Sequence, residues 1–303
     1  MAILNPVTLF RDTMRIFEQG YIEKDGTRIP LKLHDAQRRA CTVYLPEEID
    51  AIRARTDFPH ERGTGRCVIG VENMDSFALA IKRDRSDPQP EKRAGRQETL
   101  VLNLANPFRP GGGVLNGARA QEEDLCRRSS LYLSLTSAQA EPYYRYNNKL
   151  HSYLSSDAII ITPQVEIIRD ERGELLQETA VVAVMTCAAP ILRYGMQGLR
   201  EEEYERLMYG RIEGMLKTAA FHGYRRLVLG AFGCGAFRND ARVVSGIFYR
   251  VLREFSYDGL KERDCFDRID FAVLSRSEEQ YNYRQFRSRF ENYDRGGNEA
   301  ERE

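Results

Sequence analysis

The chain has 303 residues, a length that suits one large α/β domain or two small ones. Lys plus Arg and Asp plus Glu number 45 each, so the formal net charge is zero and no global positive field exists to hold nucleic acid. No apolar run is long enough to predict a signal peptide or a membrane span. We therefore expect a cytoplasmic protein, or a nuclear one in a eukaryote, that has no membrane partner and binds any polyanion through a local patch.

The first 20 residues show the spacing of an amphipathic helix, with Val7, Phe10, Met14 and Phe17 on one face. A turn at Lys24-Asp25-Gly26 follows it. Further along, six short apolar runs, rich in Val and Ile and bounded by turns, are typical of buried strands. These runs are Cys67–Val71, Thr99–Leu104, Ala158–Thr162, Ala180–Cys187, Leu227–Phe232 and Ile269–Leu274.

Amphipathic segments with helical spacing separate several of the apolar runs. They are Ser76–Lys82, Asp124–Ser137, Arg200–His222, Asp240–Phe255 and Ser277–Phe290. Strands that alternate with helices predict an α/β sandwich, with helices on both faces of a sheet. The charged, proline-bearing segment Arg83–Arg96 is expected to be an exposed loop, and residues 294–303 a polar tail.

Cysteine and histidine spacing gives no sign of a metal site. The six cysteines lie at positions 41, 67, 126, 187, 234 and 265, without a C-x-x-C pair and without a histidine at zinc-ligand spacing. In a chain of this length they are expected to be reduced thiols in the core. The sequence thus predicts neither a disulfide framework nor a metal.

A polar, glycine-rich stretch follows the run that ends at Leu104. Together with Asn103 in that run, it forms the first candidate site. Asn106 is followed by three consecutive glycines at Gly111, Gly112 and Gly113, and the site ends in Gln121-Glu122-Glu123 at the head of a predicted helix. Ligands of open α/β sheets bind at the carboxyl ends of strands, and glycines let backbone N–H groups approach a ligand closely. A bare glycine turn at the surface is the alternative, but the polar residues on both sides favour a site.

Glu122 and Glu123 are adjacent, so their side chains point in different directions. They cannot flank one glycosidic bond as the facing carboxylates of many glycosidases do. Two glutamates that only favour a helix N-terminus are the simpler interpretation. If both act, they have separate tasks: one is the acid/base, and the other fixes a sugar hydroxyl.

A second small-residue loop follows the run Leu227–Phe232. It consists of Gly233, Cys234, Gly235, Ala236 and Phe237, and Asp240 is the expected N-cap of the next helix. Strand, glycine loop and helix in this order present N–H groups to a phosphate. A tight turn is the alternative. A dinucleotide-binding Rossmann site fits poorly, since Arg238 takes the place of the third glycine in G-x-G-x-x-G.

Other candidate groups are weaker. No histidine neighbours either loop, which speaks against a Ser-His or Cys-His nucleophile. Arg109, Arg119, Arg127 and Arg128 cluster around the first loop and either form an anion patch or are simply solvated; the sequence leaves both open.

With both loops considered, the chain resembles the bacterial type of poly(ADP-ribose) glycohydrolase. That family is marked by three glycines, a spacer of several residues and Gln-Glu-Glu, as in Gly111–Gly113 and Gln121-Glu122-Glu123 here. The loop Gly233–Phe237 resembles the family's diphosphate loop. The resemblance implies a macrodomain-like three-layer sandwich with a mixed sheet at residues 63–293, and an N-terminal helical extension at 1–62 packed on it.

The resemblance also implies roles for the residues. Glu123 would be catalytic, with Glu122 on ribose hydroxyls, and Asn106 and Gly111–Gly113 would hold the distal ribose. Gln121 belongs to the same signature. The loop from Gly233 through Cys234, Gly235 and Ala236 to Phe237 would hold the diphosphate, with Phe237 pressing that ribose toward Glu123.

The implied reaction is hydrolysis of the ribose–ribose bond of poly(ADP-ribose), with ADP-ribose as product and no cofactor or metal. One glutamate that acts first as acid and then as base needs a pKa raised toward neutrality. The substrate is either the polymer or an ADP-ribosylated protein. The alternatives are a mono-ADP-ribosyl hydrolase acting on protein or nucleic acid, and a non-catalytic ADP-ribose reader; a Rossmann oxidoreductase is a distant third.

Overall fold

The protein is described from a computed structural model, which covers residues 5–24, 26–63, 65–86, 99–275, 278–291 and 293. The chain forms two compact units, which are described separately below. The first comprises Met1–Leu45, Asn103–Ser152 and Ala158–Ala188, and the second comprises Pro46–Leu102, Tyr153–Asp157 and Ala189–Glu303. The predicted tail 294–303 and residues 87–96 of the predicted loop lie outside the described residues.

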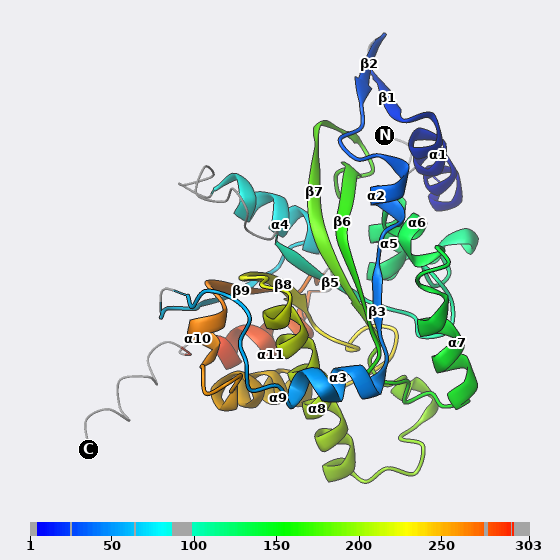
Figure 1. Cartoon of the computed structure of the whole chain (residues 1–303). Helices are drawn as coiled ribbons and strands as arrows, with labels where there is room; N and C mark the ends of the chain where they lie inside the picture. Colours follow the sequence, from blue (N-terminus) through cyan, green and yellow to red (C-terminus); the bar gives the residue numbers. More distant parts are fainter. Residues whose placement is uncertain are drawn as a thin grey trace. The chain divides into compact units, whose positions relative to one another are not determined.

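Seven strands form one mixed sheet in the order β3-β6-β7-β5-β8-β9-β4, and this sheet lies between helices (Figure 1). The predicted α/β sandwich with a mixed sheet is therefore confirmed. β3 and β7 pair antiparallel with β6, whereas β8 pairs parallel with both β5 and β9, and β9 with β4. β5, Leu100–Leu104, contains the boundary between the two units.

The first unit holds the antiparallel part of this sheet and a separate hairpin. Its elements are α1 (Pro6–Gln19), β1 (Tyr21–Lys24), β2 (Thr27–Pro30), α2 (Asp35–Arg39), β3 (Thr42–Tyr44), the short 3-10 helix η2 (Val114–Asn116), α5 (Gln121–Arg128), α6 (Leu131–Leu135), α7 (Glu141–Leu150), β6 (Ile159–Arg169) and β7 (Leu175–Cys187). The predicted turn at Lys24-Asp25-Gly26 joins β1 to β2, although Asp25 itself is not among the described residues.

α1 begins and ends where its capping residues predict. The Asn5 side chain accepts a hydrogen bond from the Val7 N–H at 2.9 Å, and Gly20 closes the helix with φ of 79°. Its buried face differs from the predicted one, because Thr13 and Ile16 are buried whereas Val7 and Met14 are only half-buried. The Thr13 hydroxyl donates to the Arg127 carbonyl at 2.6 Å, which explains why a polar residue lies on the inner face.

β6 and β7 are longer than their apolar runs predicted. The predicted strand stops at Thr162, because Pro163 follows it and proline has no N–H to donate to a sheet ladder. The structure continues β6 past it through a register shift between Thr162 and Val165, and Val165 and Ile167 are fully buried beyond the shift. Figure 1 shows the two strands side by side over most of their length.

The segment predicted as one helix over Asp124–Ser137 consists of two helices, α5 and α6. Between them, Ser130 forms two hydrogen bonds with β6: its N–H donates to the Glu166 carbonyl, and its hydroxyl accepts from the Glu166 N–H. Ser129 forms an isolated bridge with Ile167. Because this backbone is bonded to a strand, the helix cannot continue through it.

The second unit holds the parallel part of the sheet and the longest helices. Its elements are α3 (Pro46–Arg53), β4 (Val68–Glu72), α4 (Ser76–Arg85), the 3-10 helix η3 (Leu192–Tyr194), α8 (Glu201–Phe221), β8 (Arg226–Gly230), α9 (Ala241–Glu254), α10 (Glu262–Cys265), β9 (Arg268–Ala272) and α11 (Tyr281–Phe290). α3 packs on α8, and the Arg53 guanidinium lies 2.7 Å from the Glu213 carboxylate. The domain boundary predicted at residue 62 stays a prediction.

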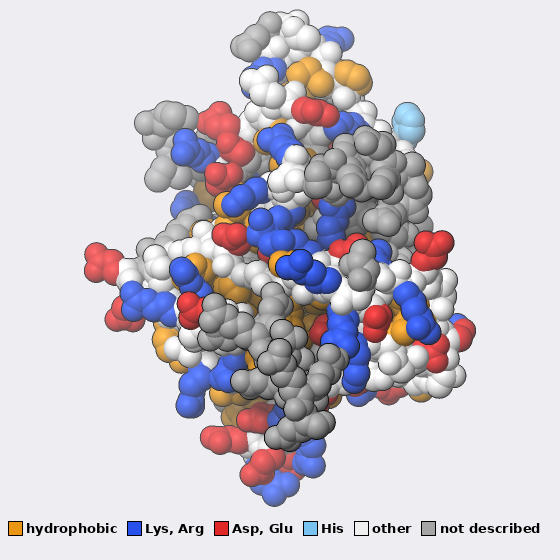
Figure 2. Space-filling model, turned by 90° about the vertical axis from the view of Figure 1, so that its left-hand side faces the viewer, with side chains coloured by type: hydrophobic (Ala, Val, Ile, Leu, Met, Phe, Trp, Pro, Cys, Tyr) orange, Lys and Arg blue, Asp and Glu red, His pale blue; other side chains and the backbone are white. Residues whose placement is uncertain are grey.

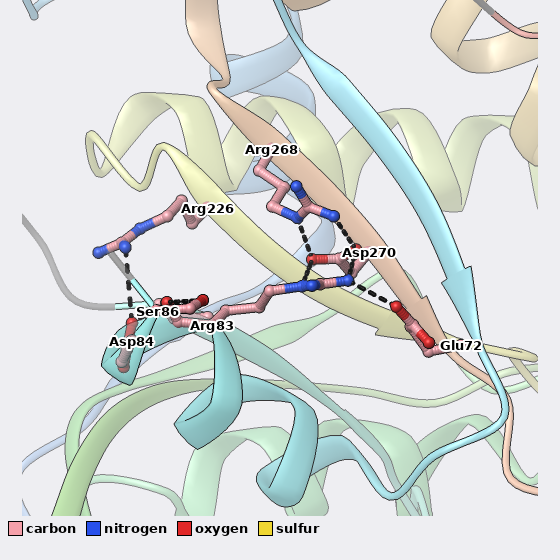
Figure 3. Close-up of polar contacts among 8 residues, drawn as sticks. Glu72, Arg83, Asp84, Ser86, Arg226, Arg268 and Asp270 are labelled. Atoms are coloured by element: carbon pink, nitrogen blue, oxygen red, sulfur yellow. Dashed lines mark hydrogen bonds and ion pairs between the residues drawn. The ribbon is translucent and has the colours of Figure 1, made fainter. Parts of the chain in front are cut away.

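The expectation that an exposed loop starts at Arg83 is wrong, because Arg83 lies in the last turn of α4. Its guanidinium binds the carboxylate of Asp270 on β9 with two hydrogen bonds of 2.9 and 3.0 Å (Figure 3). Arg268 binds the same carboxylate at 2.6 and 3.1 Å, and Glu72 accepts from Arg83 at 2.8 Å. Asp270 is only 1% exposed, so the carboxylate that the two guanidinium groups share is buried.

Replacing Asp270 with asparagine should lower the free energy of unfolding by about 3 kcal/mol, because two guanidinium groups lose their shared buried carboxylate. Chemical denaturation of the variant and the wild type measures the difference. Glu203→Gln is the matched control: its partner Arg200 is 71% exposed, and an exposed pair contributes about 1 kcal/mol at most. Equal losses in the two variants would contradict the importance of the buried cluster.

Charges of both signs share the surface shown in Figure 2. Lys and Arg side chains gather near the middle of that face, with Asp and Glu side chains beside and around them.

Within the part of the chain that the structure describes, no helix combines the length and apolar character needed to cross a bilayer. All six cysteines, at described positions, carry free thiols.

Candidate active site

The Gln-Glu-Glu motif forms the first turn of α5 in the first unit, and both glutamate side chains are buried. Glu122 is 1% exposed and Glu123 is 7% exposed. The N-cap residue, Ala120, offers no side-chain cap, and the first turn of the helix carries three acidic residues, Glu122, Glu123 and Asp124. The burial of Glu122 and Glu123 rules out the simpler interpretation of two solvated surface residues.

Glu122 is held against the end of β5. One of its carboxylate oxygens accepts the backbone N–H of Asn106 at 2.7 Å, and the other accepts the side-chain amide of Asn103 at 3.3 Å. Asn103 is fully buried, and its amide also donates to the Thr186 hydroxyl at 3.1 Å. Burial raises the pKa of Glu122 to about 8, although the hydrogen bonds from Asn106 and Asn103 act in the opposite direction.

Glu123 points toward the glycine turn instead. Its Oε1 accepts the Gly113 N–H at 2.8 Å, while its Oε2 is buried and has no hydrogen-bond partner among the described residues. An unsatisfied buried carboxylate oxygen is costly unless a ligand or water supplies a donor. The two adjacent glutamates therefore have different partners, as their different directions predicted.

The three glycines make room for these carboxylates. Gly111 and Gly112 have φ of 64° and 57°, which favours glycine. A methyl group on Gly112 would collide with the Glu123 carboxylate and lie 3.1 Å from the Glu122 Oε2. The sequence suggested that glycines let N–H groups reach a ligand; in the structure they also let the turn lie directly against both acids.

The side-chain oxygens of Asn106 and Gln121 have internal partners. The Asn106 Oδ1 accepts the N–H groups of Phe108 and Arg109 at 2.9 and 3.0 Å, forming a local turn. The Gln121 Oε1 accepts the Leu104 N–H at 2.8 Å, which joins the start of α5 to the end of β5. Their predicted contacts with substrate stay predictions.

The second predicted loop, Gly233–Phe237, lies between β8 and α9 in the second unit. The N–H groups of Gly235, Ala236 and Phe237 have no intramolecular partner among the described residues. Gly235 and Ala236 are exposed, and a methyl group on Gly235 would meet nothing within 4 Å. Free backbone donors in open space are what an anionic diphosphate requires. Asp240 caps α9 as predicted, accepting the Arg242 N–H at 2.7 Å.

Comparison with known proteins supports one family. The family model for the catalytic domain of microbial-type PARG, poly(ADP-ribose) glycohydrolase, matches residues 11–170, or 160 of the 303 residues. The chain belongs to this family. The PARG of Thermomonospora curvata bound to the inhibitor ADP-HPD is 33% identical, with a TM-score of 0.78 over 94% of this chain and 99% of that one. The PARG of Deinococcus radiodurans in complex with ADP-ribose is 35% identical, with a TM-score of 0.71 over 84% and 96%. No curated protein sequence matches the chain.

Asn103 and Asn239 are buried partners of the two loops, and their roles were not predicted from the sequence, although both residues stand in or beside the two candidate stretches. Asn103 was a detectable signal, because it is a polar residue inside an apolar run. Asn239, just before the Asp240 cap, is 3% exposed, and its amide donates to the Pro190 and Gly233 carbonyls at 2.8 and 3.0 Å. The Tyr204 hydroxyl donates to the Asn239 Oδ1 at 2.7 Å.

Of the two alternatives left open for the four arginines around the first loop, neither describes Arg127 and Arg128, because both are buried. Arg127 and Arg128 are 4% and 2% exposed; Arg127 donates to the Ala118 carbonyl at 2.5 Å, and Arg128 lies 2.7 Å from the Asp124 carboxylate. Only Arg109 and Arg119 are exposed. Among the described residues, no group of three or more His, Cys, Asp or Glu side chains could hold a metal ion.

Gly112→Ala should displace the Glu123 carboxylate, which the resemblance implies to be the acid/base. Since acid/base help accelerates a reaction roughly 10²–10⁴-fold, that role predicts a loss of turnover on the order of a hundredfold. Steady-state kinetics and thermal unfolding measure activity and stability separately. Gly259→Ala is the matched control, since Gly259 also has positive φ, 73°, but nothing lies within 4 Å of an added methyl group. Comparable activity in both variants would show that backbone strain alone, and not the contact with Glu123, accounts for any loss.

Glu122→Gln should change how stability depends on pH. Because burial raises the folded-state pKa of Glu122 from 4.5 to about 8, the folded protein keeps a proton that the unfolded chain releases. The wild type should therefore lose stability as pH rises through this window, by several kcal/mol at most, at about 1.4 kcal/mol per pKa unit. The glutamine variant should not lose it.

Urea unfolding at several pH values between 4.5 and 8 measures this difference. Glu141→Gln, on a side chain that is 55% exposed, should follow the wild-type curve. Parallel curves for Glu122→Gln and the wild type would show that Glu122 does not titrate in this range.

Proposed function

We propose that this chain hydrolyses the ribose–ribose glycosidic bond of poly(ADP-ribose) and releases ADP-ribose, with Glu123 as acid/base and Glu122 as the holder of ribose hydroxyls. Membership of the microbial-type PARG family supports the activity. The observation that supports the residue roles best is the state of Glu123: one carboxylate oxygen is fixed by Gly113, and the other is buried without a hydrogen-bond partner.

Glu123 performs two proton transfers in this proposal. In its protonated form it donates to the ribose oxygen that leaves as the glycosidic bond breaks. The distal ribose then carries oxocarbenium character, and the substrate's own diphosphate stabilises its positive charge. Glu123, now a carboxylate, takes a proton from the water that attacks the sugar, which returns the acid to its starting form. No proton is gained or lost over the cycle.

Glu122 is suited to fixing the sugar rather than transferring protons to it. Both of its oxygens already accept hydrogen bonds, from the Asn106 N–H and the Asn103 amide, which fix the orientation of its carboxyl group. Since its pKa is raised to about 8, Glu122 is largely protonated near neutral pH and can act as both donor and acceptor toward ribose hydroxyls. A proton on Glu122 also leaves Glu123 with a neutral neighbour.

The loop Gly233–Phe237 is assigned to the diphosphate in this proposal. The free N–H groups of Gly235, Ala236 and Phe237 support the assignment, because they can donate to phosphate oxygens without breaking any internal bond. The Cys234 thiol points inward, with its sulfur 3.6 Å from the Phe232 carbonyl, and burial raises its pKa, so Cys234 contributes backbone rather than a nucleophile.

The deciding experiment compares wild type and Glu123→Gln on an auto-poly(ADP-ribosyl)ated protein and on a mono-ADP-ribosylated one. Release of ADP-ribose from the polymer should fall about 10²–10⁴-fold in the variant. ADP-ribose should still bind, as calorimetry would measure. Glu141→Gln, at an acid on α7 whose side chain is 55% exposed, should keep the wild-type activity.

The outcome also decides between the remaining substrates. Release from the mono-modified protein by the wild type would extend the activity to a mono-ADP-ribosyl hydrolase. Binding of ADP-ribose without release from either substrate would leave a non-catalytic reader.

The proposal further includes an ADP-ribosylated protein as partner, and a core at residues 63–293 with the extension 1–62. It also includes a cytoplasmic location, with which the six free thiols agree.

A further inference from the structure

Two tyrosine side chains form an exposed aromatic pair on the second unit. Tyr153 is 42% exposed and Tyr194 is 56% exposed, although both rings are large and apolar. Their centroids lie 4.6 Å apart with a tilt of 41° between the planes. Exposed aromatic surface that is gathered rather than scattered commonly marks a binding site. We call this pair the tyrosine platform.

The tyrosine platform is fastened to the backbone of the candidate diphosphate loop. The N–H of Arg193, which precedes Tyr194, donates to the Phe237 carbonyl at 3.0 Å. The Ile191 N–H donates to the Tyr153 carbonyl at 2.7 Å, so the two tyrosine-bearing segments are joined as well. The Asn239 amide bridges the same segment, at Pro190, to Gly233 in the loop.

A positive charge accompanies the platform. The Arg193 guanidinium lies over the Tyr194 ring, 5.0 Å from its centroid, and the side chain is exposed. Arg238, directly after Phe237, is exposed too, and its side chain has no hydrogen-bond or ion-pair partner among the described residues, whereas its N–H donates to the Gly235 carbonyl at 3.0 Å. Arg238 also has φ of 63°, a left-handed backbone conformation that is unfavourable for a residue with a side chain. Aromatic rings beside arginines are the usual surface for stacking nucleic acid bases whose phosphates are nearby.

The polymer substrate supplies this kind of ligand. The bond that is cut joins the distal ribose of one unit to the adenosine ribose of the next, and that second ribose carries an adenine and leads to another diphosphate. Phe237, by resemblance, contacts the distal ribose. The proposed function therefore places the next adenosine beside Phe237, whose carbonyl accepts the N–H of Arg193, the residue before Tyr194.

We infer that the tyrosine platform is a second subsite that stacks the adenine of the next unit of poly(ADP-ribose), with Arg193 beside it for a phosphate. This inference rests on the proposed function, since a protein that never meets the polymer has no adjacent unit to bind. It assigns to Tyr153 and Tyr194 a part in recognising a chain of two or more units, and none in binding a single ADP-ribose.

Tyr194→Ala and the double variant with Tyr153→Ala test the inference by steady-state kinetics on size-fractionated poly(ADP-ribose). The KM for the polymer should rise about fivefold or more, since stacking contributes a factor on the order of five to a hundred per base. The kcat should change little, and the Kd of free ADP-ribose should stay the same. Tyr194→Phe, which keeps the ring, should behave as the wild type does.

The matched control is Tyr209→Ala. Tyr209 lies on α8, and its ring centroid is 5.1 Å from the guanidinium of Arg250 on α9, so it is also a tyrosine beside an arginine but is not part of the platform. An unchanged KM for the polymer in the double variant would overturn the inference. So would a rise in the Kd of ADP-ribose that matches the rise in KM, because the tyrosines would then belong to the single-unit site. If the wild type releases no ADP-ribose, the proposed function fails on its own, and equilibrium binding of polymer to the same variants still tests the platform.

Discussion

The Glu122 carboxyl group is bound by the Asn106 N–H and the Asn103 amide and is almost completely removed from water. Burying an acid in this way is unfavourable unless donors surround it or it keeps its proton. Much of the first unit near this point serves that requirement. Asn103 near the end of β5 and Asn106 just beyond it donate to the carboxyl group. The glycine turn lies where a side chain on Gly112 would collide with the acids. This constraint also fixes where Glu123 lies, because the next residue on α5 points in a different direction and accepts the Gly113 N–H.

The central elements and the two loops of this PARG could be predicted from sequence because each depends on a short stretch of chain. The apolar run Thr99–Leu104 became β5, and Asp240 capped α9, since local patterning and capping suffice for both. The Gln-Glu-Glu motif fell at the head of a helix for the same reason. Spacing alone also indicated that adjacent glutamates would have different partners.

The features that the sequence did not predict depend on partners distant in the chain. Helix α5 stops before Ser129 because β6, more than thirty residues later, bonds to Ser130. Arg83 looked like part of a charged loop, but Asp270 and Glu72 bind its guanidinium. Arg127 and Arg128 looked like a surface patch until packing buried them. In each case a polar group that reads as solvated by local rules is satisfied by a tertiary contact, which a one-dimensional pattern does not contain.

Asn239 occupies a position where one amide serves two segments, Pro190 on one side and Gly233 on the other, with Tyr204 holding its remaining oxygen. A change at this residue must be accommodated in both segments at once, whereas Ala236 and Tyr194 at the exposed tips can change one at a time. Among related sequences, we expect the amide and its tyrosine to be inherited together. The tips should diverge first, so that relatives come to differ in which polymers they prefer while the geometry beneath is kept.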